Sequence, residues 1–81
     1  MRYTVTITIA LKEGMLDPEA EAIRHALANL GFGIETLATA RVFRLVFDAP
    51  DRTAAKEQAE RMCERLLANP VIHRYEIEVR E

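Results

Sequence analysis

The sequence predicts an α+β fold, a two-layer sandwich in which two helices cover one face of an antiparallel sheet. Residues 3–11 and 71–80 alternate between apolar and polar side chains, which is the period of a strand with one buried face. Residues 17–31 and 51–68 repeat apolar side chains every three or four positions, which is typical of amphipathic helices. Residues 34–48 are rich enough in β-branched side chains to supply the remaining strands. Since each helix has one apolar stripe, both should lie on the same face of the sheet.

The first strand has a clearly apolar face. Its members are Tyr3, Val5, Ile7, Ile9 and Leu11. The nearest element that can cover this face is the helix that follows, so we expect the first helix to pack on it. The opposite face carries threonines and, with Val42 and Val46, forms a β-branched surface. We expect that surface or the adjoining strand edges to contact another copy of the chain; the alternative is that threonines are good strand formers on a wet surface.

The first helix has a start signal and a stop signal. Asp17 is placed to be the N-cap, and Pro18 follows at the first helical position, where its missing N–H costs nothing. Gly31 can adopt the left-handed conformation that ends a helix, and Phe32 can then fold back onto Leu27. The apolar stripe between these signals consists of Ile23, Leu27 and Leu30.

The middle of the chain allows two interpretations. Residues 42–49 alternate well, whereas residues 34–41 alternate poorly. No Gly or Pro lies at the turn expected near Thr39–Arg41, which counts against a tight hairpin. The segment is therefore either a hairpin or one bent strand, and we favour two strands. The element order is then β-α-β-β-α-β, a ferredoxin-like order or a close variant, with β-α-β-α-β as the alternative.

The second helix is expected to begin after Asp51, its N-cap, and to end at Asn69-Pro70, because proline disfavours helical geometry in the residue before it. Its predicted apolar stripe is Ala55, Ala59, Met62 and Leu66, flanked by Cys63 and Leu67.

Length and composition describe one small domain, residues 1–81, with 49% hydrophobic residues and a net charge of −2. The intermixed charges do not make the basic stripe that nucleic acid requires, so we expect no nucleic-acid partner. No apolar run approaches the roughly 20 residues that span a bilayer, so we also expect no membrane partner. Without an export signal and with a lone Cys63, the chain is expected to be cytoplasmic.

The sequence offers little for catalysis. It contains no serine, and Cys63 falls in the middle of a helix beside the apolar stripe, which favours a structural role. Glu21 and His25 lie one helical turn apart, but no third ligand accompanies them for zinc. His73 falls on the inner side of the last strand and is expected to be a sheltered core-edge residue. We therefore assign no catalytic, cofactor-binding or metal-ligating residue.

Two blocks of sequence carry a resemblance to a known family. They are LKEGMLDPEAEAIRHALANLGF at residues 11–32 and MCERLLANPVIHRYEIEV at residues 62–79. Both closely resemble the PurS family, the small subunit of phosphoribosylformylglycinamidine synthase, an amido-ligase of purine biosynthesis. The chain departs from the family in the middle, where Leu37-Ala38-Thr39-Ala40-Arg41 replaces the usual V-R-x-G-K.

The resemblance implies a non-catalytic assembly subunit. Such a subunit forms a dimer or tetramer with itself, bridges the ATP-dependent synthetase subunit and the glutaminase subunit, and aids ammonia transfer. ATP, Mg and glutamine are then used by the partners, and this chain binds no cofactor. The residues we expect to contact partners or sister chains are Lys12, Glu13, Gly14, Asp17, Pro18, Arg41, Asn69 and Pro70. The alternative is a ferredoxin-like regulatory module that binds a small molecule, with Gly14 in its ligand loop.

Overall fold

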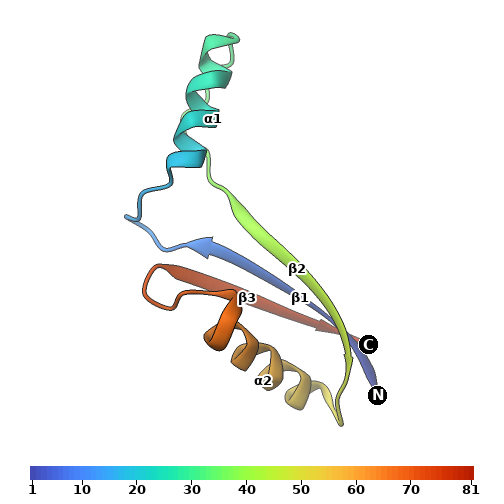
Figure 1. Ribbon diagram of the computed structural model, residues 1–81. Helices are drawn as coiled ribbons and strands as arrows, with labels where there is room; N and C mark the ends of the chain where they lie inside the picture. The colour runs from blue at the N-terminus through green and yellow to red at the C-terminus, as the bar shows by residue number, and fades with distance from the viewer.

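The computed structural model describes residues 1–81, the whole chain. The chain forms three strands and two helices, the second of which ends in a π-helical turn; Figure 1 shows their arrangement. In chain order they are β1 (Arg2–Leu11), α1 (Pro18–Asn29), β2 (Ala40–Asp48), α2 (Arg52–Met62), the π-helical turn η1 (Cys63–Leu67) and β3 (His73–Arg80). The predicted α+β class is confirmed.

The sheet is antiparallel throughout, in the order β2-β1-β3. The central strand is β1, whose alternating pattern survives in the structure. Ile7 at its middle pairs with Phe43 of β2 on one side and with Ile77 of β3 on the other. The apolar faces of all three strands therefore align, as the two-residue period requires.

The core lies between this apolar face and α2. Val5, Ile7, Ala59 and Cys63 belong to one buried cluster, and none of the four exposes any surface. Small side chains on α2 allow its backbone to approach β1 and β3 closely. The predicted N-cap is confirmed, because the Asp51 carboxylate accepts a hydrogen bond of 2.8 Å from the Ala54 N–H. Neither α1 nor α2 has the length and apolar character needed to cross a bilayer.

The expectation that both helices cover the sheet is wrong for α1. Figure 1 shows α1 projecting beyond the end of the sheet at which β1 ends and β2 begins. We call residues 12–39, which contain α1 and its two connections, the arm. The arm stretches the molecule to 51 × 25 × 15 Å and its radius of gyration to 16.2 Å, against about 12 Å for a compact domain of this length. The caps and the apolar stripe specify that α1 is helical, but they do not specify which surface it covers.

The preference for two strands in residues 34–48 is also wrong. Only β2 forms, and residues 33–39 lie outside any strand, so the element order is β-α-β-α-β. The pairing between β1 and β2 ends at Ala10 and Ala40, and both edges of β1 are already occupied by β2 and β3. Within this chain residues 33–39 therefore have no strand to pair with, and the fourth strand of the ferredoxin-like order is absent.

The end of the second helix departs from the predicted stripe. The Ala68 N–H donates to the Cys63 carbonyl at 2.9 Å, a π-type bond that lengthens the turn. Cys63 follows Ala55 and Ala59 at four-residue intervals and is buried with them, whereas Leu66, inside the lengthened turn, is 83% exposed. The assignment of Leu66 to the core-facing stripe was wrong for this reason.

Burial raises the pKa of the Cys63 thiol, and the nearby Glu60 and Glu64 carboxylates add to the rise. We expect native protein to react with a thiol reagent at pH 8 at least about 100-fold more slowly than protein unfolded in urea. In the native state little of the Cys63 thiol is ionised, and the reagent cannot reach the buried sulfur atom. The rate of colour release from a disulfide reagent measures this. Equal rates in the two states would contradict the buried position.

Candidate functional site

The end of the sheet next to the arm gathers most of the residues expected to contact partners. The Lys12 N–H donates to the Ile72 carbonyl at 2.8 Å, which joins the loop after β1 to the turn before β3. Gly14 lies in the first loop with a φ of +82°, a backbone conformation that favours glycine. Arg41, the second residue of β2, lies at the same end, opposite Ile9. The structure therefore places the loop after β1, from the first sequence block, beside the turn before β3, from the second. The contacts of these residues with partners stay a prediction.

Asn69 shapes the turn between η1 and β3. Its side-chain oxygen accepts from the Val71 N–H at 3.0 Å, and its own N–H donates to Nδ1 of His73 at 2.9 Å. Its carbonyl accepts from the His73 N–H at 2.8 Å. His73 is half-buried, as expected, and the bond from Asn69 holds its ring. Pro70 follows on the exposed outside of this turn.

Asp17 ties the two connections of the arm together. One carboxylate oxygen caps α1 by accepting from the Ala20 N–H at 3.0 Å. The other accepts from the hydroxyl of Thr39 at 2.9 Å. The predicted N-cap is confirmed, with Pro18 at the start of α1. Sequence reasoning missed Thr39, since nothing local marks a hydroxyl whose partner lies 22 residues away.

The bonds from Ala20 and Thr39 lower the pKa of the Asp17 carboxyl. A carboxyl with a lowered folded-state pKa stabilises the fold above its unfolded value, about 3.9, and loses that contribution as the pH falls through the folded value. We expect the Ala20 amide resonance to titrate with a midpoint below about 3.9 in the wild type. In Asp17→Asn, which keeps a capping oxygen, the same resonance should not respond to pH. A wild-type midpoint at or above the ordinary value would contradict the two bonds.

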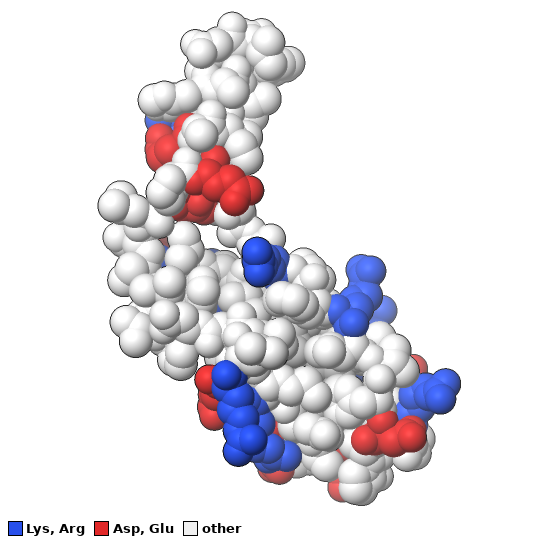
Figure 2. Space-filling view, viewed as in Figure 1, with Lys and Arg blue, Asp and Glu red and all other residues white.

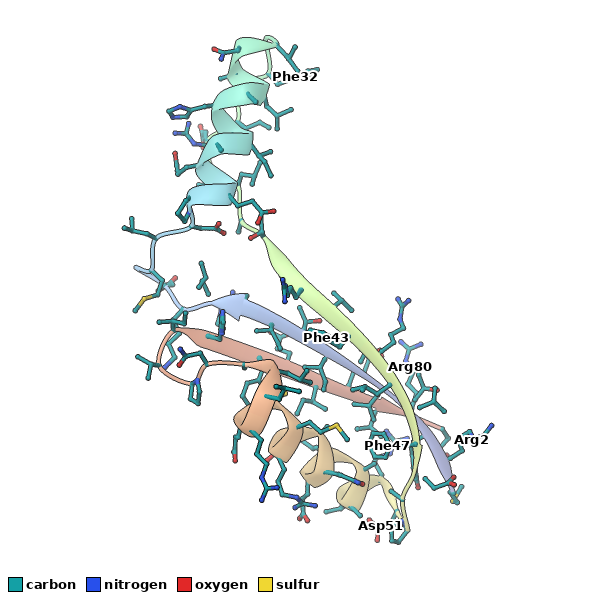
Figure 3. The ribbon with its side chains drawn as sticks, viewed as in Figure 1. Arg2, Phe32, Phe43, Phe47, Asp51 and Arg80 are labelled. Carbon is teal, nitrogen blue, oxygen red and sulfur yellow. The ribbon has the colours of Figure 1, made fainter.

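The arm carries an uncovered apolar surface. Leu30 is 74% exposed, Phe32 58% and Ile23 40%, and Phe32 lies at the tip of the arm (Figure 3). The predicted glycine stop is confirmed: Gly31 has a φ of +100°, and the Phe32 N–H donates to the Leu27 carbonyl at 2.9 Å. Ala20 is the one buried residue of α1. A helix with one apolar stripe requires a covering surface, and this chain does not supply one to α1.

Charge is distributed unevenly over the arm. On the face shown in Figure 2, acidic side chains gather at its base and its tip is uncharged. The acidic residues of the first helical turn are Glu19 and Glu21. Glu21 accepts from Arg24 at 2.9 Å, which lowers the pKa of the Glu21 carboxyl, while His25 lies 3.7 Å from the same oxygen. The helical Glu21–His25 contact is thus a surface pair, and no group of three or more metal-ligating side chains is present in the structure.

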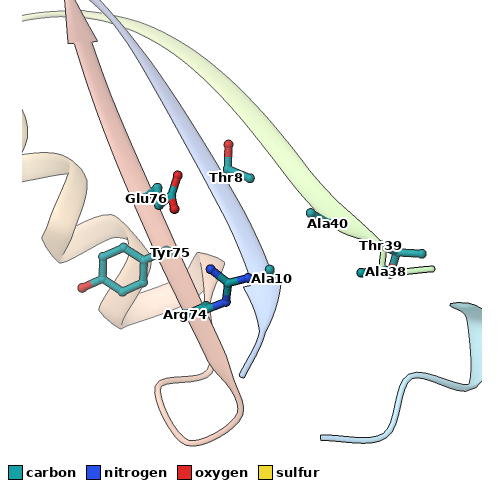
Figure 4. A pocket seen from close by; sticks show the side chains of 8 residues that line it. All are labelled: Thr8, Ala10, Ala38, Thr39, Ala40, Arg74, Tyr75 and Glu76. Atoms are coloured by element: carbon teal, nitrogen blue, oxygen red, sulfur yellow. The ribbon is translucent and has the colours of Figure 1, made fainter. Parts of the chain in front are cut away.

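Hollows open on both sides of the sheet, and the three main ones are described here. One of ≈ 360 Å³ opens on the sheet beside the base of the arm, and Figure 4 shows Thr8, Arg74 and Glu76 on its lining. A second, of ≈ 400 Å³, includes Arg41, Thr39 and His73. The third, of ≈ 480 Å³, lies between α2 and β2. It is lined by Leu45, Gln58, Arg61, Met62, Arg65, Leu66 and Leu67, and we call it the groove.

Comparison with known proteins agrees with this architecture. The family model of PurS, described as phosphoribosylformylglycinamidine (FGAM) synthase, matches residues 4–81. The chain belongs to the PurS family. The PurS subunit of phosphoribosylformylglycinamidine synthase from Methanothermobacter thermautotrophicus is 43% identical over 81 residues, which is 100% of this chain and 96% of that protein. The corresponding subunit from Archaeoglobus fulgidus is 47% identical over 76 residues, covering 93% and 95% of the two chains.

Solved PurS structures have the same fold over nearly the whole chain. The crystal structure of Methanocaldococcus jannaschii PurS is 41% identical and matches with a TM-score of 0.87, covering 98% of this chain and 96% of that one. The PurLQS structure from Thermotoga maritima contains a chain that matches with a TM-score of 0.89 at 26% identity, covering 99% of each chain. The resemblance of the two sequence blocks to PurS is thereby confirmed over nearly the whole chain.

Proposed function

We propose that this PurS chain is a non-catalytic assembly subunit of FGAM synthase in purine biosynthesis. It associates with itself as a dimer or tetramer, bridges a synthetase subunit and a glutaminase subunit, and helps ammonia pass between them without loss to solvent. ATP, Mg and glutamine are used by those partners. The observation that carries the proposal is the match over residues 4–81 to a family of FGAM synthase subunits.

Two further observations support a role in assembly. The Thermotoga maritima PurLQS structure holds a PurS-like chain together with PurL and PurQ, which suggests the same kinds of partner for this chain. The conspicuous residues of the two sequence blocks cap α1, close turns and join loops, as Asp17 and Asn69 do. Such residues fix the shape of a contact surface, whereas proton transfer requires an acid and a base aimed at a common point.

The test is reconstitution of the synthetase, the glutaminase and this chain, with glutamine-dependent amidine formation as the readout. Omitting this chain should lower the rate at least about 10-fold, because two catalytic centres then lose their fixed proximity. Ammonium supplied in place of glutamine should restore part of the rate. An unchanged rate without the chain, or turnover by the purified chain alone, would overturn the proposal.

A further inference from the structure

The face of the sheet opposite α2 has a hollow beside the base of the arm. Arg74 of β3 lies opposite Ala10, and Ala10 lies opposite Ala40 of β2. Two alanines therefore follow one arginine across the sheet, and their short side chains leave a hollow of ≈ 360 Å³. Thr8 and Glu76, the next pair on this face, extend the lining (Figure 4). The hollow thus combines a guanidinium, a carboxylate and a hydroxyl with an apolar floor.

Arg74 and Glu76 do not neutralise each other. They lie two residues apart on one face of β3, about 7 Å along the strand, and neither belongs to an ion pair in the structure. Glu78 and Arg80 have the same spacing at the far end of β3, and there Nε of Arg80 donates to Oε1 of Glu78. An arginine and a glutamate at this spacing can therefore contact each other directly. In the hollow the two opposite charges stay apart and are available to a ligand.

We propose that this hollow binds a free α-amino acid. The carboxylate of the ligand accepts from the guanidinium of Arg74, which can donate two parallel hydrogen bonds to it. The ammonium of the ligand donates to the carboxylate of Glu76. A simple anion would be repelled by Glu76 and a simple cation by Arg74, whereas a zwitterion is attracted by both. This site goes beyond the bridging role in FGAM synthase and does not depend on it.

The size and the remaining polar groups of the hollow support such a ligand. Its ≈ 360 Å³ lies near the lower end of the range of about 300–1,000 Å³ for small-molecule sites, which favours one amino acid over a dinucleotide. Ala38 is on the lining but outside any strand, and its N–H and C=O groups make no backbone hydrogen bond. One donor and one acceptor are therefore free for a polar side chain of the ligand, such as the carboxamide of glutamine.

Titration of the isotope-labelled chain with L-glutamine, followed by NMR, tests the site. The amide resonances of Thr8, Ala10 and Arg74 should shift until they saturate, with a dissociation constant of about 1–10 mM because both charged contacts face solvent. L-Alanine has the same two charged groups and should shift the same resonances. N-Acetyl-L-glutamine lacks the ammonium and L-alaninamide lacks the carboxylate, so each should bind at least about 10-fold more weakly.

Substitutions at the two ends of β3 provide the matched comparison. Arg74→Gln and Glu76→Gln each remove one charge from the hollow and should raise the dissociation constant at least about 10-fold. Arg80→Gln and Glu78→Gln remove the same charges outside the hollow and should keep the wild-type constant. All four side chains are exposed, so none of these changes disturbs the core, and the spectrum of each variant checks its fold.

Three results would overturn the proposal. They are the absence of a saturable shift with either amino acid, equal binding of the acetylated or amidated compounds, and equal effects of the substitutions at the two ends of β3. The reconstitution assay judges the bridging role separately. A rate of amidine formation that is independent of this chain, with amino-acid binding intact, would overturn the bridging and leave the site standing.

Discussion

Replacement of Ile7 by alanine is expected to lower the free energy of unfolding by about 2–5 kcal/mol. Ile7 exposes no surface and lies at the centre of the middle strand, between Phe43 and Ile77. Shortening the side chain removes apolar contacts and leaves a cavity that the alanine-rich surface of α2 has no long side chains to fill. Domains have only about 5–15 kcal/mol of stability in total, so the change consumes a large part of it.

Urea unfolding followed by circular dichroism measures this loss. Wild type and variant must be compared at one protein concentration, because self-association adds to apparent stability. Thr8→Ala is the matched control: Thr8 is the next residue of β1 and points to the opposite, half-covered face. That change should cost no more than about 1 kcal/mol. Equal losses in the two variants would contradict the assignment of the core to the face that α2 covers.

Local rules predict the elements of this chain well. Strict alternation over residues 3–11 identifies β1, and the capping carboxylates Asp17 and Asp51 identify the starts of both helices. Gly31 identifies the end of α1. Each of these signals acts within a few residues, so the sequence window that contains it also contains its physical cause.

Placement of the elements could not be predicted in the same way. The assumption that an apolar stripe packs on its own chain fails for α1, because a stripe specifies that a surface must be covered and not which copy covers it. The single π-type bond from Ala68 to Cys63 likewise shifts Leu66 out of the core, and periodicity alone does not reveal such a bond.

The candidate site could be predicted in part: its residue types could be identified from the sequence, but their positions relative to one another could not. Asp17, Gly14 and Asn69 were visible because capping and turn formation select their residue types. Their proximity at one end of the sheet depends on non-local bonds, such as Lys12 to Ile72 and Thr39 to Asp17. Tertiary geometry sets those bonds, and they became visible only in the structure.

Replacement of residues 12–38 by Asn-Gly should leave the three-stranded sheet folded and abolish self-association. Ala10 and Ala40 are paired in the sheet, so Leu11 and Thr39 come next in register and a two-residue turn can join them. Asn-Gly is the favoured dipeptide for such a turn because both positions require positive φ. The arm contributes only Ala20 to the buried residues, so its removal deletes little of the core but all of α1.

Hydrogen exchange, sedimentation and the reconstituted enzyme together give the outcome. Amides in the middle of β1 should stay protected, since both neighbours of that strand remain. The variant should sediment as a monomer, and glutamine-dependent amidine formation should fall to the rate measured without this chain. Loss of protection in β1 would mean that the arm supports the single-chain fold, whereas a variant that still dimerises would show that the contact lies elsewhere. Retained protection combined with lost assembly would separate the two roles of the molecule: β1, β2, β3 and α2 form the fold, and the arm carries its association.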